Sequence, residues 1–246
     1  MTTYTGTSGI DTFTYGFAHS TADIKWISDS KGGSGLEISH AGSKTGSSDS
    51  GSKTDSSSSD GKTGSTSSGS KTGSTTGSTT SISDIFYDYE RIRFSDYEAA
   101  FDIEWTESAG AALALINAGF GDIDSDSNPD IGRWIHVSDA YASSGSKSGT
   151  DSHARVEHVA QSMLDYYAPD ISNKNLVYIL YTNVVGTEPT INNLNYYVDL
   201  LEQGTYTQAG LFALAAESEL NTADYYDDES GGLSHYYYTP YVDSKA

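Results

Sequence analysis

The residues with the clearest capacity for chemistry lie in one acidic stretch, DIDSDSNPD. Its oxygen-bearing side chains are Asp122, Asp124, Asp126, Asn128 and Asp130. Because they alternate with other residues, one looped or extended backbone can turn several of their oxygens toward calcium, which oxygen ligands contact at about 2.3–2.6 Å. The first three aspartates have the spacing of a calcium-binding loop. These five residues are therefore the predicted metal site, with calcium as the predicted ion.

Two positions depart from the pattern of a calcium loop. Ser127 stands where the loop needs a glycine, and Arg133 stands where a bidentate glutamate belongs. The alternative interpretation is an acidic surface loop inserted in a helical turn. Two other acidic stretches are more typical of a turn and of a solvated tail: GTSGIDTF from Gly6, a single imperfect copy of a repeat, and ADYYDDESGG from Ala223.

The six histidines form no recognisable catalytic or metal-binding motif. His153 and His158 are not at the spacing that places two zinc ligands on one helical face. The absence of cysteine excludes disulfides, thiolate metal sites and cysteine nucleophiles. We therefore expect no enzymatic activity. An acidic secreted hydrolase ranks last among the alternatives, because abundant carboxylates alone do not define a glycosidase pair.

The charge of the chain limits its partners. The 246 residues carry a formal net charge of -21, whereas phosphate binding needs a basic face, so we expect no nucleic-acid partner. The same charge disfavours anionic membranes and favours multivalent cations. The longest apolar stretch, AGAALALINAGF from Ala109, is shorter than the roughly 18 residues of a membrane helix. We expect no membrane insertion.

The elements that must position any site change in kind along the chain. Over residues 1–105 apolar residues recur with a period of two, which is typical of short strands. The segment ERIRF, for example, places Ile92 and Phe94 on one face and Arg91 and Arg93 on the other. This part of the chain is predicted to be a small region of short antiparallel strands.

A low-complexity segment interrupts these strands. Residues 43–80 consist almost wholly of Ser, Gly, Thr, Lys and Asp, and they include no aliphatic or aromatic residue. Such a segment cannot bury enough apolar surface to offset the entropy of ordering. We expect a loop or linker here, and the alternative is a surface modified through its hydroxyl groups.

From residue 106 the apolar period changes to 3.6, which is typical of helices. The helix candidates are SAGAALALINAGF, SHARVEHVAQSMLDYY, SNKNLVYILYTNVVG, TINNLNYYVDLLEQG and TQAGLFALAAESEL. Ser172 and Thr190 are at starts of these helices, and Gly186 and Gly204 are at ends. The predicted fold class is α+β: the β region, an all-α bundle over residues 106–222, and an acidic, tyrosine-rich tail over residues 223–246.

The most specific pattern lies in the last three helix candidates. It is carried by Leu180, Tyr181, Asn183, Val184, Gly186, Pro189, Leu194, Tyr196, Tyr197, Gly204, Ser218, Glu219 and Asn221. This order resembles the bacterial domain of unknown function 4214. Thr187 departs from it, standing where the family usually has arginine, and Tyr197 or its neighbour replaces a tryptophan.

Two upstream segments extend the resemblance. The stretch DYERIRFSDYEAAFDIEW from Asp88 resembles a segment that often precedes this domain, and GTSGIDTFTYG from Gly6 is similar to the edge of RTX-type calcium-binding repeats. The resemblance implies an extracellular bacterial protein, often a surface-layer, adhesin or matrix component, and implies no known reaction. Because the first residues lack the pattern of a signal peptide, we expect type I secretion without a cleaved leader.

Nineteen tyrosines, including the run YYYTPY from Tyr236, suit either core packing or contacts between molecules. We therefore expect an extracellular structural protein, a calcium-stabilised subunit that self-assembles as a homo-oligomer or polymer into a filament, surface layer or matrix. The alternative is an adhesin, a binding module that recognises a glycan or a cell surface.

Overall fold

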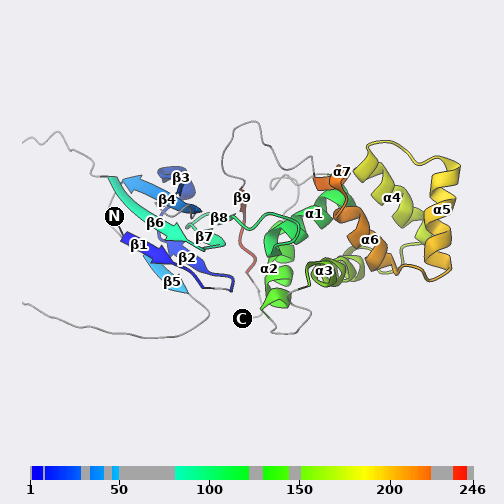
Figure 1. Cartoon of the computed structure of the whole chain (residues 1–246), viewed down its shortest axis with the longest axis horizontal. Coiled ribbons are helices and arrows are strands. Elements are labelled where there is room, and N and C mark those ends of the chain that lie inside the picture. The colour runs from blue at the N-terminus through cyan, green and yellow to red at the C-terminus, as the bar shows by residue number, and fades with distance from the viewer. Residues whose placement is uncertain are drawn as a thin grey trace, which may run out of the picture.

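The computed structural model describes residues 2–7, 9–28, 34–41, 46–49, 81–121, 130–143, 151–222 and 235–242. Strands from the first hundred residues gather at one end of the molecule, and the seven α-helices of the described residues follow at the other (Figure 1). The predicted α+β fold class is confirmed. No helix in the described part of the chain is long and apolar enough to span a membrane.

The strands form two small sheets. One has the order β1 (Thr2–Thr5), β6 (Ser81–Tyr87), β4 (Ser34–Ala41) and β3 (Ala22–Ser28). The other has the order β5 (Gly46–Asp49), β2 (Thr12–Tyr15), β7 (Arg91–Arg93), β8 (Glu98–Ala100) and β9 (Tyr236–Tyr238). The β1–β6 and β2–β7 pairs are parallel and the other pairs are antiparallel. A short 3₁₀ helix, His19–Thr21, precedes β3.

The core between the sheets is rich in aromatic rings. Phe13 packs against Phe86 with ring centroids 4.9 Å apart, and Ile92 and Phe94 are buried in the same cluster. Aromatic and β-branched side chains cover large apolar areas on a pleated surface, which stabilises short strands that would be marginal alone. The face of ERIRF that was predicted to be apolar, with Ile92 and Phe94, is therefore the face that lies in this core.

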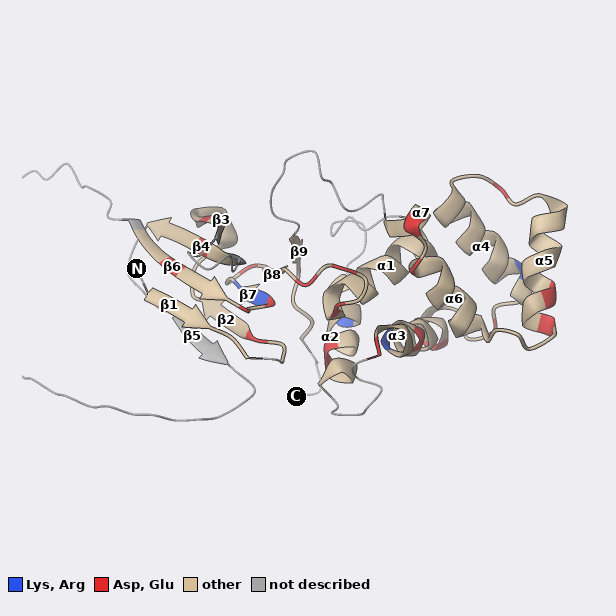
Figure 2. Cartoon of the chain, in the orientation of Figure 1, with Lys and Arg blue, Asp and Glu red and all other residues tan. Residues whose placement is uncertain are grey.

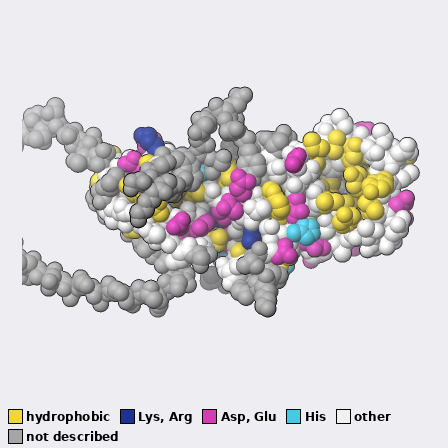
Figure 3. Space-filling model, viewed as in Figure 1, with side chains coloured by type: hydrophobic (Ala, Val, Ile, Leu, Met, Phe, Trp, Pro, Cys, Tyr) yellow, Lys and Arg dark blue, Asp and Glu magenta, His cyan; other side chains and the backbone are white. Residues whose placement is uncertain are grey.

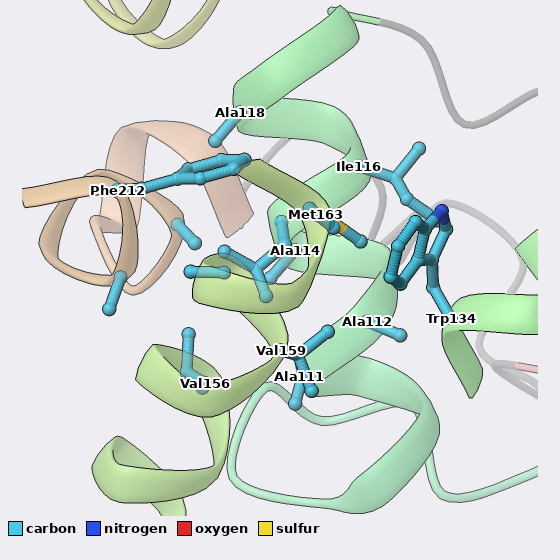
Figure 4. Close-up of a cluster of buried hydrophobic side chains, with 14 of the residues drawn as sticks. Ala111, Ala112, Ala114, Ile116, Ala118, Trp134, Val156, Val159, Met163 and Phe212 are labelled. Atoms are coloured by element: carbon cyan, nitrogen blue, oxygen red, sulfur yellow. The ribbon is translucent and has the colours of Figure 1, made fainter. Parts of the chain in front are cut away.

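Helix α1 lies at the centre of the helical region, and most of the other helices pack against it. The bounds of the helices are α1 Ser108–Phe120, α2 Ile131–Ala142, α3 Ser152–Tyr167, α4 Asn173–Val185, α5 Ile191–Glu202, α6 Gln208–Ala216 and α7 Glu219–Thr222. Helix α1 packs against α2, α3, α4 and α6. Its small residues allow these neighbours to come close: Ala111, Ala114 and Ala118 lie among Val159, Met163 and Phe212 in the buried cluster of Figure 4.

The helix ends follow the predicted capping residues. The side chains of Ser172, Thr190 and Thr207 accept backbone N–H groups at the starts of α4, α5 and α6. Gly186 ends α4 in the left-handed conformation, at φ 74°, and Gly204 has φ 69° just after α5. Such caps satisfy backbone groups that the helix leaves unpaired, and side chains other than glycine rarely adopt positive φ.

The strands were expected to be antiparallel, but the β1–β6 and β2–β7 pairs are parallel. Three elements also differ from the sequence prediction. Helix α2 was not expected, β5 lies inside the expected linker, and β9 lies inside the expected tail. Strand pairing uses backbone groups, so the polar segment Gly46–Asp49 can pair with β2 without apolar side chains of its own. Likewise β9 is held by its pairing with β8, a partner distant in the sequence.

Candidate interaction surface on the helical region

An apolar groove opens on the helical region among α4, α5, α6 and α7. Its volume is about 550 Å³. Its lining residues are Trp105, Val177, Leu180, Tyr181, Val184, Val185, Tyr197, Leu211, Leu214, Ala215, Glu217, Ser218 and Leu220. Figure 3 shows hydrophobic side chains gathered over this end of the molecule, on a face that the two sheets leave free.

The groove exists because its helices carry more apolar surface than the core can bury. Helix α6 buries Leu211, Phe212 and Ala213 against its neighbours, yet Leu214 on its other side is 41% exposed and lines the groove. Val185 of α4 is exposed to the same extent at the opposite wall. A helix that is apolar on more than one face is typical of a helix with a further partner.

Two strongly exposed apolar side chains lie in or beside the groove. Leu220 of α7, in the lining, is 59% exposed, and Tyr196 of α5 is 60% exposed. The ring of Tyr196 lies 5.2 Å from the ring of Tyr197, which lines the groove. The surface thus combines a hollow with projections beside it.

Among the described residues that line the groove, Glu217 is the one that carries a charge. The ring nitrogen Nδ1 of His153, on α3, lies 2.8 and 3.0 Å from its two carboxylate oxygens. This hydrogen bond raises the pKa of His153, and the charges of Glu157 and Asp151 act in the same direction. Protonated His153 compensates the charge of Glu217, and the groove then has little electrostatic character.

Asparagine side chains fix the walls of the groove to α1. The Asn221 side-chain nitrogen donates to the carbonyl oxygens of Ala114 and Ala216 at 2.9 and 2.8 Å. The Asn117 side chain donates back to the carbonyl oxygen of Asn221 at 3.0 Å, and Asn183 donates to Ala118 at 3.0 Å. Asn183 and Asn221, two positions of the family-like pattern, therefore hold helices in place.

Of the five predicted metal ligands, only Asp130 lies within the described residues. Asp122, Asp124, Asp126 and Asn128 lie outside the described residues. The carboxylate of Asp130 accepts a hydrogen bond from the Tyr167 hydroxyl at 2.7 Å and lies 3.6 Å from the Arg133 Nε atom. Among described residues, no group of three or more His, Asp or Glu is placed to hold a metal ion. Calcium binding at these five residues stays a prediction.

Arg133 and Tyr167, beside Asp130, belong to an aromatic cluster at the start of α2. The Arg133 guanidinium carbon lies 4.8 Å from the ring centroids of both Tyr166 and Tyr241. Burial, followed by the hydrogen bond to Asp130, raises the pKa of Tyr167 to about 12. Arg133, which occupies the glutamate position of a calcium loop, thus has a packing role here.

A second hollow, of about 190 Å³, lies near β6 and the segment before α1. Asp88, Glu90, Asp102 and Glu107 are among its lining residues. Burial raises the pKa of Glu90 and of Glu107. Asp102 is already engaged by Arg91, and no Ser, Thr, Lys or His is among the described residues that line the hollow. Carboxylates by themselves define no reaction.

The sequence also did not reveal a buried ion-pair network between the sheets and the helices. Arg91 of β7 is 1% exposed and contacts the carboxylates of Asp102 and Asp139, and the Ser108 hydroxyl donates to Asp139 at 2.6 Å. Asp102 also accepts the backbone N–H of Ala109 at 3.1 Å, at the start of α1. Alternation predicted the face of Arg91 but not that helices cover that face.

The fold and its surface define an α+β protein whose helical part presents an open apolar groove. Within it, residues 160–225 match the family described as Domain of unknown function (DUF4214). The matched segment includes α4 to α7 and contains all the described lining residues of the groove except Trp105. No curated protein and no solved structure matched the chain.

Proposed function

We propose that this chain is a non-catalytic structural subunit that assembles with its own copies through the groove of α4 to α7. The observation that carries the proposal is the groove itself: an apolar hollow of about 550 Å³ with Leu214, Val185 and Leu220 exposed in its lining. Burying exposed apolar surface is the main favourable term in protein association. On a chain with net charge -21, an uncharged face is also where two copies repel each other least.

The proposed setting is outside a bacterial cell, in a filament, surface layer or matrix. The absence of cysteine, the acidic composition and the Ser- and Thr-rich segment 43–80 are compatible with that setting. The resemblance of GTSGIDTFTYG, from Gly6, to exported RTX-type calcium-binding repeats supports it and supports type I secretion. Calcium at Asp122, Asp124, Asp126, Asn128 and Asp130 would lower the repulsion between carboxylates in assembled copies.

Sedimentation velocity over a range of protein concentrations tests the proposal. The natural chain should sediment as dimers or larger assemblies at high concentration. Leu214→Asp places a charge in the groove, and we expect it to form smaller assemblies than the natural chain at the same concentration. Val242→Asp is the matched control, since Val242 is 80% exposed and is not a lining residue of the groove. A natural chain that stays monomeric at every concentration, with and without calcium, would overturn the proposal.

An adhesin that binds a glycan is the second candidate. It is favoured by the exposed rings of Tyr178 and Tyr196, 40% and 60% exposed, because aromatic faces pack against sugar rings. A monodisperse chain that binds sugars, and that loses this binding when these two tyrosines are replaced by alanine, would establish the adhesin in place of the assembly subunit. Glycan binding is measured by calorimetry on the full chain.

A further inference from the structure

We infer that the groove receives α5 of a second copy of this chain, in a two-fold dimer in which Tyr196 of each copy enters the groove of the other. This inference rests on the proposed function and names its partner segment. The dimer formed through the groove is then the repeating unit of the assembly. Growth beyond the dimer then uses a different face, because a two-fold contact closes on itself.

The groove has a projecting side chain beside it. Tyr196 is 60% exposed and its ring lies 5.2 Å from that of Tyr197, a residue of the groove lining. The projecting side chain and the hollow therefore share one patch of surface. A two-fold interface pairs a patch with itself, so a projection beside a hollow is the arrangement that such an interface needs. A head-to-tail contact would instead use two separate patches.

The first half of α5 exposes no charged side chain. The exposed residues at its start, Ile191, Asn192, Asn195 and Tyr196, are uncharged. Its exposed acidic residues, Asp199 and Glu202, lie in the second half of the helix, as the red segments of α5 in Figure 2 show. The first half of α5 can therefore approach another copy without opposing like charges at the contact.

The side chain of Tyr196 suits the chemistry of the groove lining. The groove offers aliphatic walls from Leu214, Val185 and Leu220, and a single carboxylate, Glu217, that is already engaged by His153. Tyrosine is suited to such a place, because its ring buries a large apolar area and its hydroxyl remains able to bond at the rim. A charged or phosphorylated segment would have no cationic partner among the described lining residues.

Engineered thiols test the contact directly, because the natural chain has no cysteine. Asn195→Cys is next to the projection, and Ala215→Cys is in the groove lining. When the two single variants are mixed and treated with a short thiol-specific cross-linker, covalent dimers should form at least about tenfold faster than in a mixture of Asn195→Cys with Val242→Cys. Equal rates in the two mixtures would overturn the inference.

Substitutions at position 196 give a second, independent measurement. Tyr196→Ala should weaken the dimer by about tenfold or more, as expected for an aromatic anchor in a pocket. Tyr196→Phe should retain most of the affinity, and Tyr206→Ala is the matched control, since Tyr206 is exposed and is not a lining residue. A Tyr196→Ala dimer of unchanged affinity would overturn the inference.

These outcomes separate the inference from the proposed function. If the natural chain associates in sedimentation but the thiol pair does not react, assembly uses another contact, so the proposed function stands and the α5 contact falls. If the chain is monomeric at every concentration, both fall. Circular dichroism of each variant checks that the helices are retained, and Asn195, Tyr196 and Ala215 all lie outside the buried core.

Discussion

Arg91 of β7 and Asp139 of α2 are 48 positions apart in the sequence, yet the Arg91 Nη2 atom donates to the Asp139 Oδ1 atom at 2.8 Å. The pair joins the sheets to the helices in the interior of the molecule, and Tyr238 of β9 is buried beside it. A buried arginine of this kind is stable only with its carboxylate partners, because desolvation of an isolated charge is costly.

Arg91→Ala should therefore destabilise the folded chain strongly. It leaves the carboxylates of Asp102 and Asp139 without their main cation, and removing one partner of a buried ion pair costs about 3–5 kcal/mol. Chemical denaturation measures the change in the free energy of unfolding. Lys25→Ala is the control, since its pair with Asp23 is exposed, and it should not change stability measurably. Equal effects of the two substitutions would contradict a structural role for the Arg91 network.

Asn221→Ala should also destabilise the chain, because the Asn221 side chain holds α7 and α6 against α1. The substitution leaves the carbonyl oxygens of Ala114 and Ala216 without their side-chain donor in a buried place, which costs about 2–3 kcal/mol. Thermal unfolding followed by circular dichroism measures the loss. Asn195→Ala, at an exposed position of α5, should have no comparable effect. A fully stable Asn221→Ala chain would show that these bonds do not hold the groove walls.

The pair of His153 and Glu217 predicts a pH dependence. The pKa of His153 is raised in the folded chain, so its contribution to stability is complete below the ordinary histidine pKa of about 6.5 and is lost as pH rises through the raised value. His153→Gln should lower the free energy of unfolding at pH 5.5 and leave it unchanged near pH 9. The loss should stay below about 1 kcal/mol, since His153 is half exposed. A loss of equal size at both pH values would contradict this assignment.

Calcium binding at the acidic stretch is tested by substitution and by removal of the metal. Asp124→Asn and Asp126→Asn should each weaken calcium binding by about tenfold, because each removes a charged oxygen ligand. Isothermal titration calorimetry measures the affinity, and Asp165→Asn, at an exposed position of α3, serves as control. In the natural chain a chelator should lower the melting temperature. If all three variants bind calcium with the same affinity, the prediction of a calcium site at this stretch is wrong.

In the helical region, local sequence patterns predicted several helix ends but not every helix. The starts of α4 and α5 at Ser172 and Thr190 were predictable, because a capping side chain bonds to a backbone group only two or three positions away. The stop of α4 at Gly186 was predictable for a similar reason, since glycine readily adopts the left-handed conformation. By contrast, α2 was missed although Ile131, Trp134 and Ile135 recur at helical spacing and are buried on one face, where they pack against neighbouring elements.

The candidate surface was predictable only in part. The pattern of the last three helix candidates implied no known reaction, but Leu214 fits the same apolar repeat of α6 as the buried Leu211. Only the arrangement of α4 to α7 decides which of them the core buries and which remain in an open groove.

The sequence by itself determined the change from strands to helices, the helix caps, the absence of thiol chemistry and the acidic charge, because each depends on composition or on neighbours within one turn or one strand. The tertiary structure alone decided that Arg91 is buried, that Tyr236–Tyr238 completes a sheet and that a groove stays open. These features depend on contacts between residues far apart in the chain, and no local pattern records which distant surfaces meet.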